Sequence, residues 1–192
     1  MAVTLNKGQP VSLKKMAATP LTRVRMGLGW DAMKIRKFFG GYREQAIDLD
    51  ASCLIFDAAG ALIDQVWFNQ LKSADGSISH TGDNTTGEGD GDDESIIVEL
   101  ESVNPAAKQL VFVVSSYSGE SFSQIENAFC RLVDETNQAE LARYDLTGSG
   151  AHTAQIMAKL SRSSDGWEMT AIGTRTSGRT IRDLIPASAA AL

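Results

Sequence analysis

Short strand-like segments, separated by turn residues, constrain the fold of this chain more than any other feature. Residues 22–28 place valine, methionine and leucine on one side and two arginines on the other, which is typical of a strand with one buried face. Roughly ten segments show such a pattern, and no long stretch with a helical period lies between them. The sequence therefore predicts an all-β fold, an antiparallel β-sandwich of two roughly five-stranded sheets with short helical pieces.

The predicted elements follow from the same patterns. The predicted strands are residues 3–7, 11–15, 22–28, 47–55, 62–69, 96–100, 110–116, 128–133, 141–146, 154–160 and 167–174. Short helical pieces are predicted at residues 122–125 and 181–184. Residues 34–43 show no steady period and are predicted to form a loop. The 192 residues are enough for one full hydrophobic core, so we treat residues 1–192 as a single domain.

Several cellular settings are disfavoured by the composition. No apolar run approaches the roughly 20 residues that a membrane-spanning helix needs, and residues 1–8 lack the pattern of a secretion signal. We therefore expect a cytoplasmic protein without direct membrane insertion. Cys53 and Cys130 lie in apolar strands without a second cysteine or a histidine at zinc-ligand spacing, so we expect buried, reduced thiols and no zinc site.

The formal net charge of −6 is unevenly distributed along the chain. Residues 1–47 contain nine Lys/Arg and two acidic residues, which leaves the remainder strongly acidic. The simplest interpretation is a basic arm that packs across an acidic body. Residues 7–43 are an alternative polyanion-binding module, but Lys34, Arg36 and Lys37 lack the frame of a known nucleic-acid-binding motif. Nucleic acid is therefore an unlikely partner.

Residues 82–94 form a loop that is rich in carboxylates and glycines and contains no basic residue. Its carboxylates belong to Asp83, Glu88, Asp90, Asp92, Asp93 and Glu94. The interspersed glycines permit positive φ angles and inward-turned carbonyls, and Asn84 adds a neutral oxygen. Calcium takes six to eight oxygens in flexible geometry, whereas magnesium prefers a smaller shell. The loop favours calcium, and a solvated acidic loop without an ion is the alternative.

Asp48 and Asp50 add two carboxylates outside this loop. Both lie in the predicted strand 47–55 and are two positions apart, so they share one face of it. A neighbouring acidic loop can converge with them.

Named loop motifs fit this segment less well than a non-repeating cation site. An EF-hand requires glycine at its sixth position, where this loop has Glu88. Gly82 and Gly87 have the spacing of a phosphate-binding loop, but Glu88 and Gly89 replace its Lys-Ser/Thr pair. The single Gly-Asp run is too short to stack as calcium β-helix repeats do.

Catalysis has weaker support than ion binding. Paired carboxylates can serve a metal-assisted hydrolase, which we keep as an alternative function. The histidines are His80 and His152, and no Gly-x-Ser-x-Gly elbow accompanies them. Nucleophilic catalysis therefore has less support than the metal-assisted hydrolase.

Several segments together resemble the TerD-domain family of tellurite-resistance and stress-response proteins. The segments are residues 26–31 (MGLGWD), 47–53 (IDLDASC), 71–76 (LKSADG) and 80–94 (HTGDNTTGEGDGDDE). Residues 126–132 (ENAFCRL), 142–146 (ARYDL) and 152–158 (HTAQIMA) are similar to the TerZ branch, so the resemblance covers nearly the whole chain. Residues 174–179 depart from the family, because TRTSGR replaces a more glycine-rich tract.

The resemblance implies a non-catalytic, two-sheet β-sandwich that binds more than one Ca²⁺. It also implies other Ter-family proteins and a TerC-like membrane protein as partners. The metal ligands that it implies are Asp31, Asp48, Asp50, Asp83, Asn84, Gly87, Gly89, Asp92, Asp93 and Glu94. The two glycines would contribute backbone carbonyls, and the role of Asp31 rests on the resemblance alone.

Overall fold

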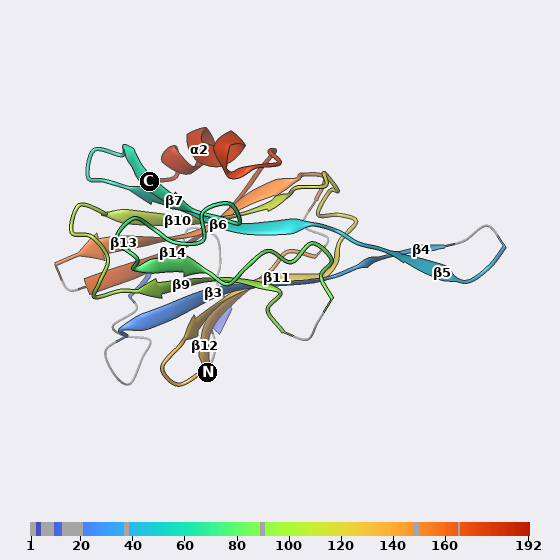
Figure 1. The fold of residues 1–192 in the computed structure, drawn as a ribbon, viewed down its shortest axis with the longest axis horizontal. Helices are drawn as coiled ribbons and strands as arrows, with labels where there is room; N and C mark the ends of the chain where they lie inside the picture. Colours follow the sequence, from blue (N-terminus) through green and yellow to red (C-terminus); the bar gives the residue numbers. More distant parts are fainter. Residues whose placement is uncertain are drawn as a thin grey trace.

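Two β-sheets packed face to face make up the body of the protein, as the computed structural model shows (Figure 1). The structure describes residues 3–4, 10–12, 21–36, 39–88, 91–147, 150–164 and 166–192. The first sheet contains, in spatial order, β1 (Val3–Thr4), β12 (Ala139–Asp145), β11 (Glu126–Asp134), β3 (Arg23–Asp31), β9 (Glu94–Glu99) and β8 (Ile78–His80). The second contains β2 (Pro10–Ser12), β14 (Gly166–Thr176), β13 (Ala154–Ser163), β10 (Gln109–Ser116), β6 (Leu49–Phe56) and β7 (Leu62–Val66).

Each sheet is built from five antiparallel strands, with one short N-terminal strand added at an edge. β1 runs parallel to β12, and β2 runs antiparallel to β14. The predicted antiparallel sandwich is therefore confirmed. No helix in the described chain combines the length and apolar character needed to cross a bilayer.

The alternation predicted for residues 22–28 is present in β3. Val24, Met26 and Leu28 are buried in the core between the sheets, while Arg23 is exposed and Arg25 is half-buried on the opposite face. Because side chains alternate along a strand, one run of sequence both builds the core and leaves a polar outer face.

β6 is buried on both of its faces. Ala51 and Cys53 face the core between the sheets, whereas Leu54 and Phe56 belong to a second apolar cluster on the other side. Helix α2 (Ile181–Ala189) covers that second cluster. The helical piece predicted at 181–184 is thus confirmed and extends further, but the one predicted at 122–125 is wrong, because those residues form a turn with two buried side chains, Phe122 and Ile125.

Both cysteines are buried and free of disulfides, as predicted. Burial raises the pKa of the Cys130 thiol to about 12, and burial also raises the pKa of Cys53. A thiol held protonated in this way is a poor nucleophile and a poor metal ligand.

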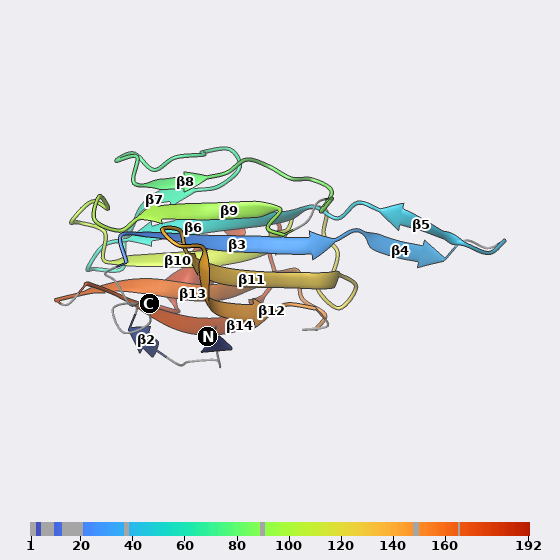
Figure 2. The ribbon, with the colours of Figure 1, turned by 90° about the horizontal axis from the view of Figure 1, so that it is seen from below.

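A two-stranded hairpin extends from one end of the sandwich (Figures 1 and 2). It consists of β4 (Met33–Arg36) and β5 (Tyr42–Gln45), which pair from Met33 with Gln45 to Arg36 with Tyr42. The loop predicted for 34–43 is therefore wrong over these strands. Arg36, Tyr42 and Arg43 are exposed, so these positions give no apolar alternation from which a strand could be predicted.

Candidate metal centre

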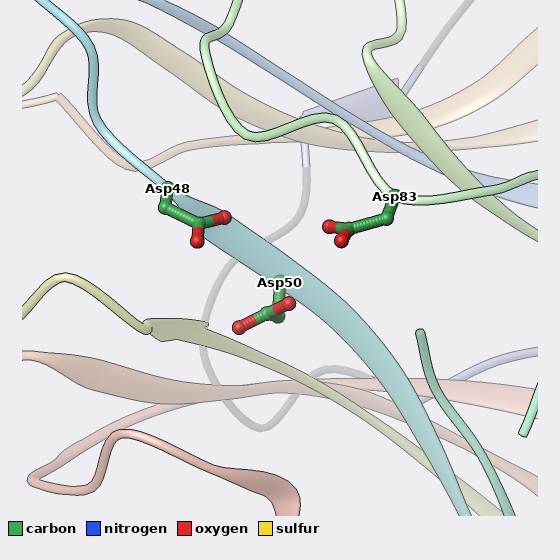
Figure 3. Close-up of side chains that lie close together, drawn as sticks. All are labelled: Asp48, Asp50 and Asp83. Carbon is green, nitrogen blue, oxygen red and sulfur yellow. The ribbon is translucent and has the colours of Figure 1, made fainter. Parts of the chain in front are cut away.

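Three carboxylates converge where the acidic loop meets β6. Asp48, Asp50 and Asp83 each offer one oxygen, and these oxygens all lie within 4.8 Å of one another. Figure 3 shows the three side chains directed into a common space. Asp50 lies on β6, Asp48 immediately precedes β6, and Asp83 comes from the loop between β8 and β9.

The pairing of β6 leaves room for this loop. β10 pairs with β6 along its whole length, but β7 pairs only with the part from Cys53 to Phe56. The edge of β6 from Leu49 to Ser52 is therefore free of a strand partner on that side, and its backbone N–H groups need other acceptors.

Glu94 meets this need from the start of β9. Its side chain is fully buried, and one carboxylate oxygen, Oε2, accepts the Ala51 N–H at 2.8 Å. The other oxygen, Oε1, accepts the Asn84 N–H at 3.1 Å. Glu94 therefore ties the first half of the loop to β6, beside Asp50.

The His80 side chain lies next to the Glu94 carboxylate. Its Nδ1 accepts the Gly82 N–H at 3.0 Å, so in the neutral ring the proton sits on Nε2. Nε2 lies 3.3 Å from Glu94 Oε2, and both side chains are completely buried. The structure thus places His80 against the loop through Gly82, with its Nε2 facing Glu94 but without a hydrogen bond to it.

Asn84 and Asp93 join the two ends of the loop. The Asn84 side-chain oxygen accepts the N–H groups of Thr86 and Gly87, each at 3.0 Å, and its amide donates to Asp93 Oδ1 at 3.1 Å. Asp93 Oδ2 in turn accepts the Trp30 N–H at 2.9 Å, which fixes the loop to β3.

Glycines let the loop lie directly on β3. A Cβ atom on Gly27 would overlap the Asp92 carboxylate, and one on Gly29 would overlap the Gly91 carbonyl oxygen. Glycine inside a strand often marks such a close backbone approach. Gly27 and Gly29 within β3 were therefore a sequence signal for where the loop lies, and the sequence analysis did not use it.

Asp92 and Asp31 lie apart from the three converging carboxylates. Asp92 is held between two arginines, since Arg131 Nε lies 2.7 Å from its Oδ1 and Arg25 pairs with its Oδ2. Asp31, at the end of β3, accepts a hydrogen bond from the Asn127 side-chain amide. Ion binding by either residue stays a prediction.

The remaining predicted ligands are glycines. Gly87 is buried at a positive φ of 67°, and its Cα lies so close to the Trp30 indole that a Cβ would overlap it. Gly89 lies outside the described residues.

Burial and mutual repulsion dominate the electrostatics of the centre. Burial, followed by the charges of Glu94, Asp48 and Asp83, raises the pKa of Asp50 to about 8. For Asp48, burial and then Asp83, Glu94 and Glu120 raise the pKa to about 6. Like charges held close together favour protonation unless a cation neutralises them.

Two buried oxygens of this centre lack a hydrogen-bond partner, namely Asp48 Oδ1 and Asp50 Oδ2. No ion pair reaches either carboxylate within the part of the chain that the structure describes. An unsatisfied buried charged group is costly, and hard oxygen donors are what calcium-type cations bind. The donor set thus fits a divalent cation.

Asp93 and three residues of neighbouring segments complete the surroundings. Burial raises the pKa of Asp93 against the lowering effect of the Trp30 N–H, and the Asp31 and Glu94 charges add to the rise. Ser115, opposite Asp50 on β10, has a buried hydroxyl oxygen without a partner. Ser118 accepts the Asp48 N–H and donates to Glu120. Sequence reasoning missed Ser115, Ser118 and Glu120, because only sheet register and loop folding bring them here.

A β-sandwich with a carboxylate-lined loop docked on its end is the class that this fold and site define. The model of the TerD domain matches residues 1–186, and this chain belongs to the TerD-domain family of tellurium-resistance and stress-response proteins.

Relatives match over nearly the full length. Tellurium resistance protein TerZ from Serratia marcescens is 46% identical over 184 residues, covering 95% of this chain and 94% of that protein. Tellurium resistance protein TerD from an Alcaligenes species is 44% identical, covering 93% of each chain. Stress response protein SCP2 from Bacillus subtilis (strain 168) is 38% identical, covering 96% of this chain and 98% of that protein.

Among solved structures, the fold is similar to that of a homologue of telluride resistance protein (TerD) from Streptomyces coelicolor A3(2). The TM-score is 0.71 at 20% identity, with 86% of this chain and 96% of that chain covered.

Proposed function

We propose that this protein is a non-catalytic, calcium-binding member of the tellurite-resistance and general stress-response system. A calcium ion is held by Asp48, Asp50 and Asp83, with the loop fixed around it by Glu94. The observation that carries the proposal is the pair of buried, unpartnered oxygens on Asp48 and Asp50 within a cluster of three carboxylates. When bound, the ion would supply positive charge that offsets their repulsion.

A second ion belongs to the same proposal. Asp31 and Asp93 are close enough for the charge of one to raise the pKa of the other, and neither belongs to the three-carboxylate cluster. Asp92 is committed to two arginines. Both Glu94 and Asp93 accept hydrogen bonds at both oxygens, but the Glu94 side chain is fully buried whereas Asp93 is only partly buried. We therefore assign Asp92 and Glu94 mainly to holding the loop, and Asp31 and Asp93 to the second ion.

Cytoplasmic location is part of the proposal. Other Ter-family proteins and a TerC-like membrane protein are proposed as partners on the ground of family resemblance. The competing hydrolase hypothesis predicts hydrolytic turnover that depends on added metal and is lost in Asp50→Asn, whereas the calcium-binding proposal predicts no turnover under the same conditions.

Isothermal calorimetry tests the proposal. Metal-free protein at physiological salt should take up more than one Ca²⁺, and Asp48→Asn/Asp50→Asn should lose one site. The matched control is Glu101→Gln, which changes charge at an exposed position away from the centre and should bind like the unmodified protein. Absence of calcium uptake, or uptake unaffected by the double substitution, would contradict the assignment.

A further inference from the structure

The β4–β5 hairpin extends beyond the sandwich and pairs chiefly with itself (Figures 1 and 2). A two-stranded hairpin without further packing is only marginally stable in water. Contact with a further surface would therefore stabilise this hairpin.

The end of the hairpin is aromatic and basic. Phe39 is 97% exposed and Tyr42 is 67% exposed, the largest values among the large apolar side chains that the structure describes. Arg36 and Arg43 are exposed beside them. Residues 33–45 contain four Lys/Arg and one Glu in a chain whose net charge is −6. Aromatic residues together with arginine are typical of interface hot spots, and the matching surface should be hollow, apolar and acidic.

A hollow of that kind lies elsewhere on the same molecule. A pocket of about 220 Å³ lies between β7, the turn around Ala74 and the segment from Val103 to Ala107. Its lining includes buried Ile55 and Ile78. The volume is below the roughly 300–1,000 Å³ of ordinary small-molecule sites, and is nearer to the size of a large side chain or two.

The rim of this pocket combines apolar and acidic groups. Ile63 is 44% exposed there, and Asp64 and Asp75 contribute carboxylates. Burial opposes ionisation of Asp75, but hydrogen bonds from Ser73, Ser77 and Asn104 outweigh it and lower the pKa of Asp75 to about 2. This carboxylate is therefore negative at neutral pH. Arg162 lies behind the pocket and donates to the carbonyls of Val103 and Ala107, which fixes the segment that forms one wall.

We propose that the hairpin of one copy of this chain docks its Phe39 end into the pocket of a second copy, between Ile63 and Ala106. The basic residues of the hairpin then lie beside the Asp64 and Asp75 carboxylates. Hairpin and pocket lie at opposite ends of the sandwich, since β7 is far from β4 and β5 (Figure 1). The contact is therefore head-to-tail, because the hairpin of one copy meets the pocket of the other. Each pair then leaves one hairpin and one pocket unoccupied, to which further copies can bind.

A second copy fits better than a polyanion such as nucleic acid or an anionic lipid surface. Apart from its N-terminal part the chain is strongly acidic, so its body is repelled by a large anionic surface that comes within a Debye length, about 8 Å at physiological salt. The pocket, in contrast, requires only local approach of the hairpin. It also supplies an apolar cavity for an aromatic ring, which a phosphate backbone does not.

The test measures molar mass by light scattering across a concentration series, with the full chain at physiological salt. Unmodified protein should exceed the monomer mass as concentration rises. Phe39→Ser removes the inserted ring, and Ile63→Arg blocks the pocket. Each should weaken association at least about 30-fold, the effect of losing an interface hot spot.

A mixture of the two variants gives the sharpest result. The Phe39→Ser copy keeps an intact pocket and the Ile63→Arg copy keeps an intact hairpin, so the mixture should form pairs and stop there. Ala106→Arg, at an exposed rim position, repeats the pocket block should Ile63→Arg not fold. Arg43→Glu reverses a charge of the exposed hairpin and should weaken association. Its charge control is Arg182→Glu, on the exposed side of α2, which should assemble normally.

Several outcomes overturn the proposal. The first is unmodified protein that stays monomeric up to about 1 mM, which corresponds to a very weak affinity. The second is a mixture of the two variants that fails to form pairs. The third is binding of monomeric protein to anionic vesicles or nucleic acid that Phe39→Ser abolishes. Calcium binding should be equal in all these variants, so failure here is distinct from failure of the calcium proposal.

Discussion

Substituting Asp50 by asparagine should stabilise the metal-free protein at neutral pH while weakening calcium binding. Asp50 is 3% exposed, and one of its oxygens has no hydrogen-bond partner. Burial and the neighbouring carboxylates raise its pKa to about 8, so the folded protein must either keep this group protonated or tolerate a buried negative charge. Asparagine has nearly the same shape and never ionises.

The sign of the pH dependence follows from proton linkage. Unfolded Asp50 has its ordinary pKa of about 3.9, so between that value and about 8 the folded state binds more protons than the unfolded state. Stability of the metal-free protein therefore falls as pH rises through this window. One proton corresponds to about 1.4 kcal/mol per pH unit, or about 2.7 kcal/mol from pH 5 to pH 7.

Solvent screening at the loop reduces this figure, and we take about half of it. The metal-free Asp50→Asn variant should then be more stable than the unmodified protein by about 1–2 kcal/mol at pH 7, or by a few degrees in Tm for a chain of this size. With calcium bound, Asp50→Asn should no longer be the more stable protein. The ion neutralises Asp50 in the unmodified protein, whereas it binds the variant more weakly because one carboxylate charge is missing.

Urea unfolding at pH 5, 6, 7 and 8, with a chelator and then with calcium, measures the effect. The difference between the two curves at each pH reports the effect of the substitution at Asp50. Glu101→Gln should follow the unmodified protein. A metal-free Asp50→Asn that is less stable at pH 7, or a stability difference that is the same at pH 5 and pH 8, would refute the reasoning.

Other perturbations address the framework around the ion. Gly27→Ala places a Cβ against the Asp92 carboxylate, so denaturant unfolding should show a loss of about 1–3 kcal/mol, and calorimetry should show weaker calcium binding. Glu94→Gln puts an amide N–H₂ opposite one of two backbone donors and should cost about 1–3 kcal/mol by the same assay; unchanged stability would remove its anchoring role. Arg131→Leu leaves the Asp92 carboxylate with one arginine partner and should lower the free energy of unfolding. The same substitution should lower it less in an Asp92→Asn background; equal losses in the two backgrounds would show that the pair does not interact. Calcium at a hundred times its Kd should stabilise the fold by about 2.7 kcal/mol, and EDTA should reverse the rise in Tm.

The fold was predictable from sequence wherever a strand has one buried face. Alternation in β3 gave both the strand and its inward residues. The β4–β5 hairpin escaped prediction because residues 34–43 show no steady period. A short helical piece was predicted at residues 122–125, but Phe122 and Ile125 reach the core from a turn.

The site was predictable only in part. The period of two placed Asp48 and Asp50 on one face of a strand, and the structure brings them together with Asp83. Their convergence with Asp83 depends on how β9 and its loop cross the free edge of β6, which no local pattern encodes. The environment of Asp92 depends on cross-strand neighbours instead, since Arg25 and Arg131 come from β3 and β11, distant in sequence.

The most direct test of the calcium centre is a crystal structure determined at saturating Ca²⁺. We expect an ion at about 2.3–2.6 Å, the calcium–oxygen distance, from carboxylate oxygens of Asp48, Asp50 and Asp83. A structure in which residues 83–94 are ordered and no ion lies among these three carboxylates would contradict the account.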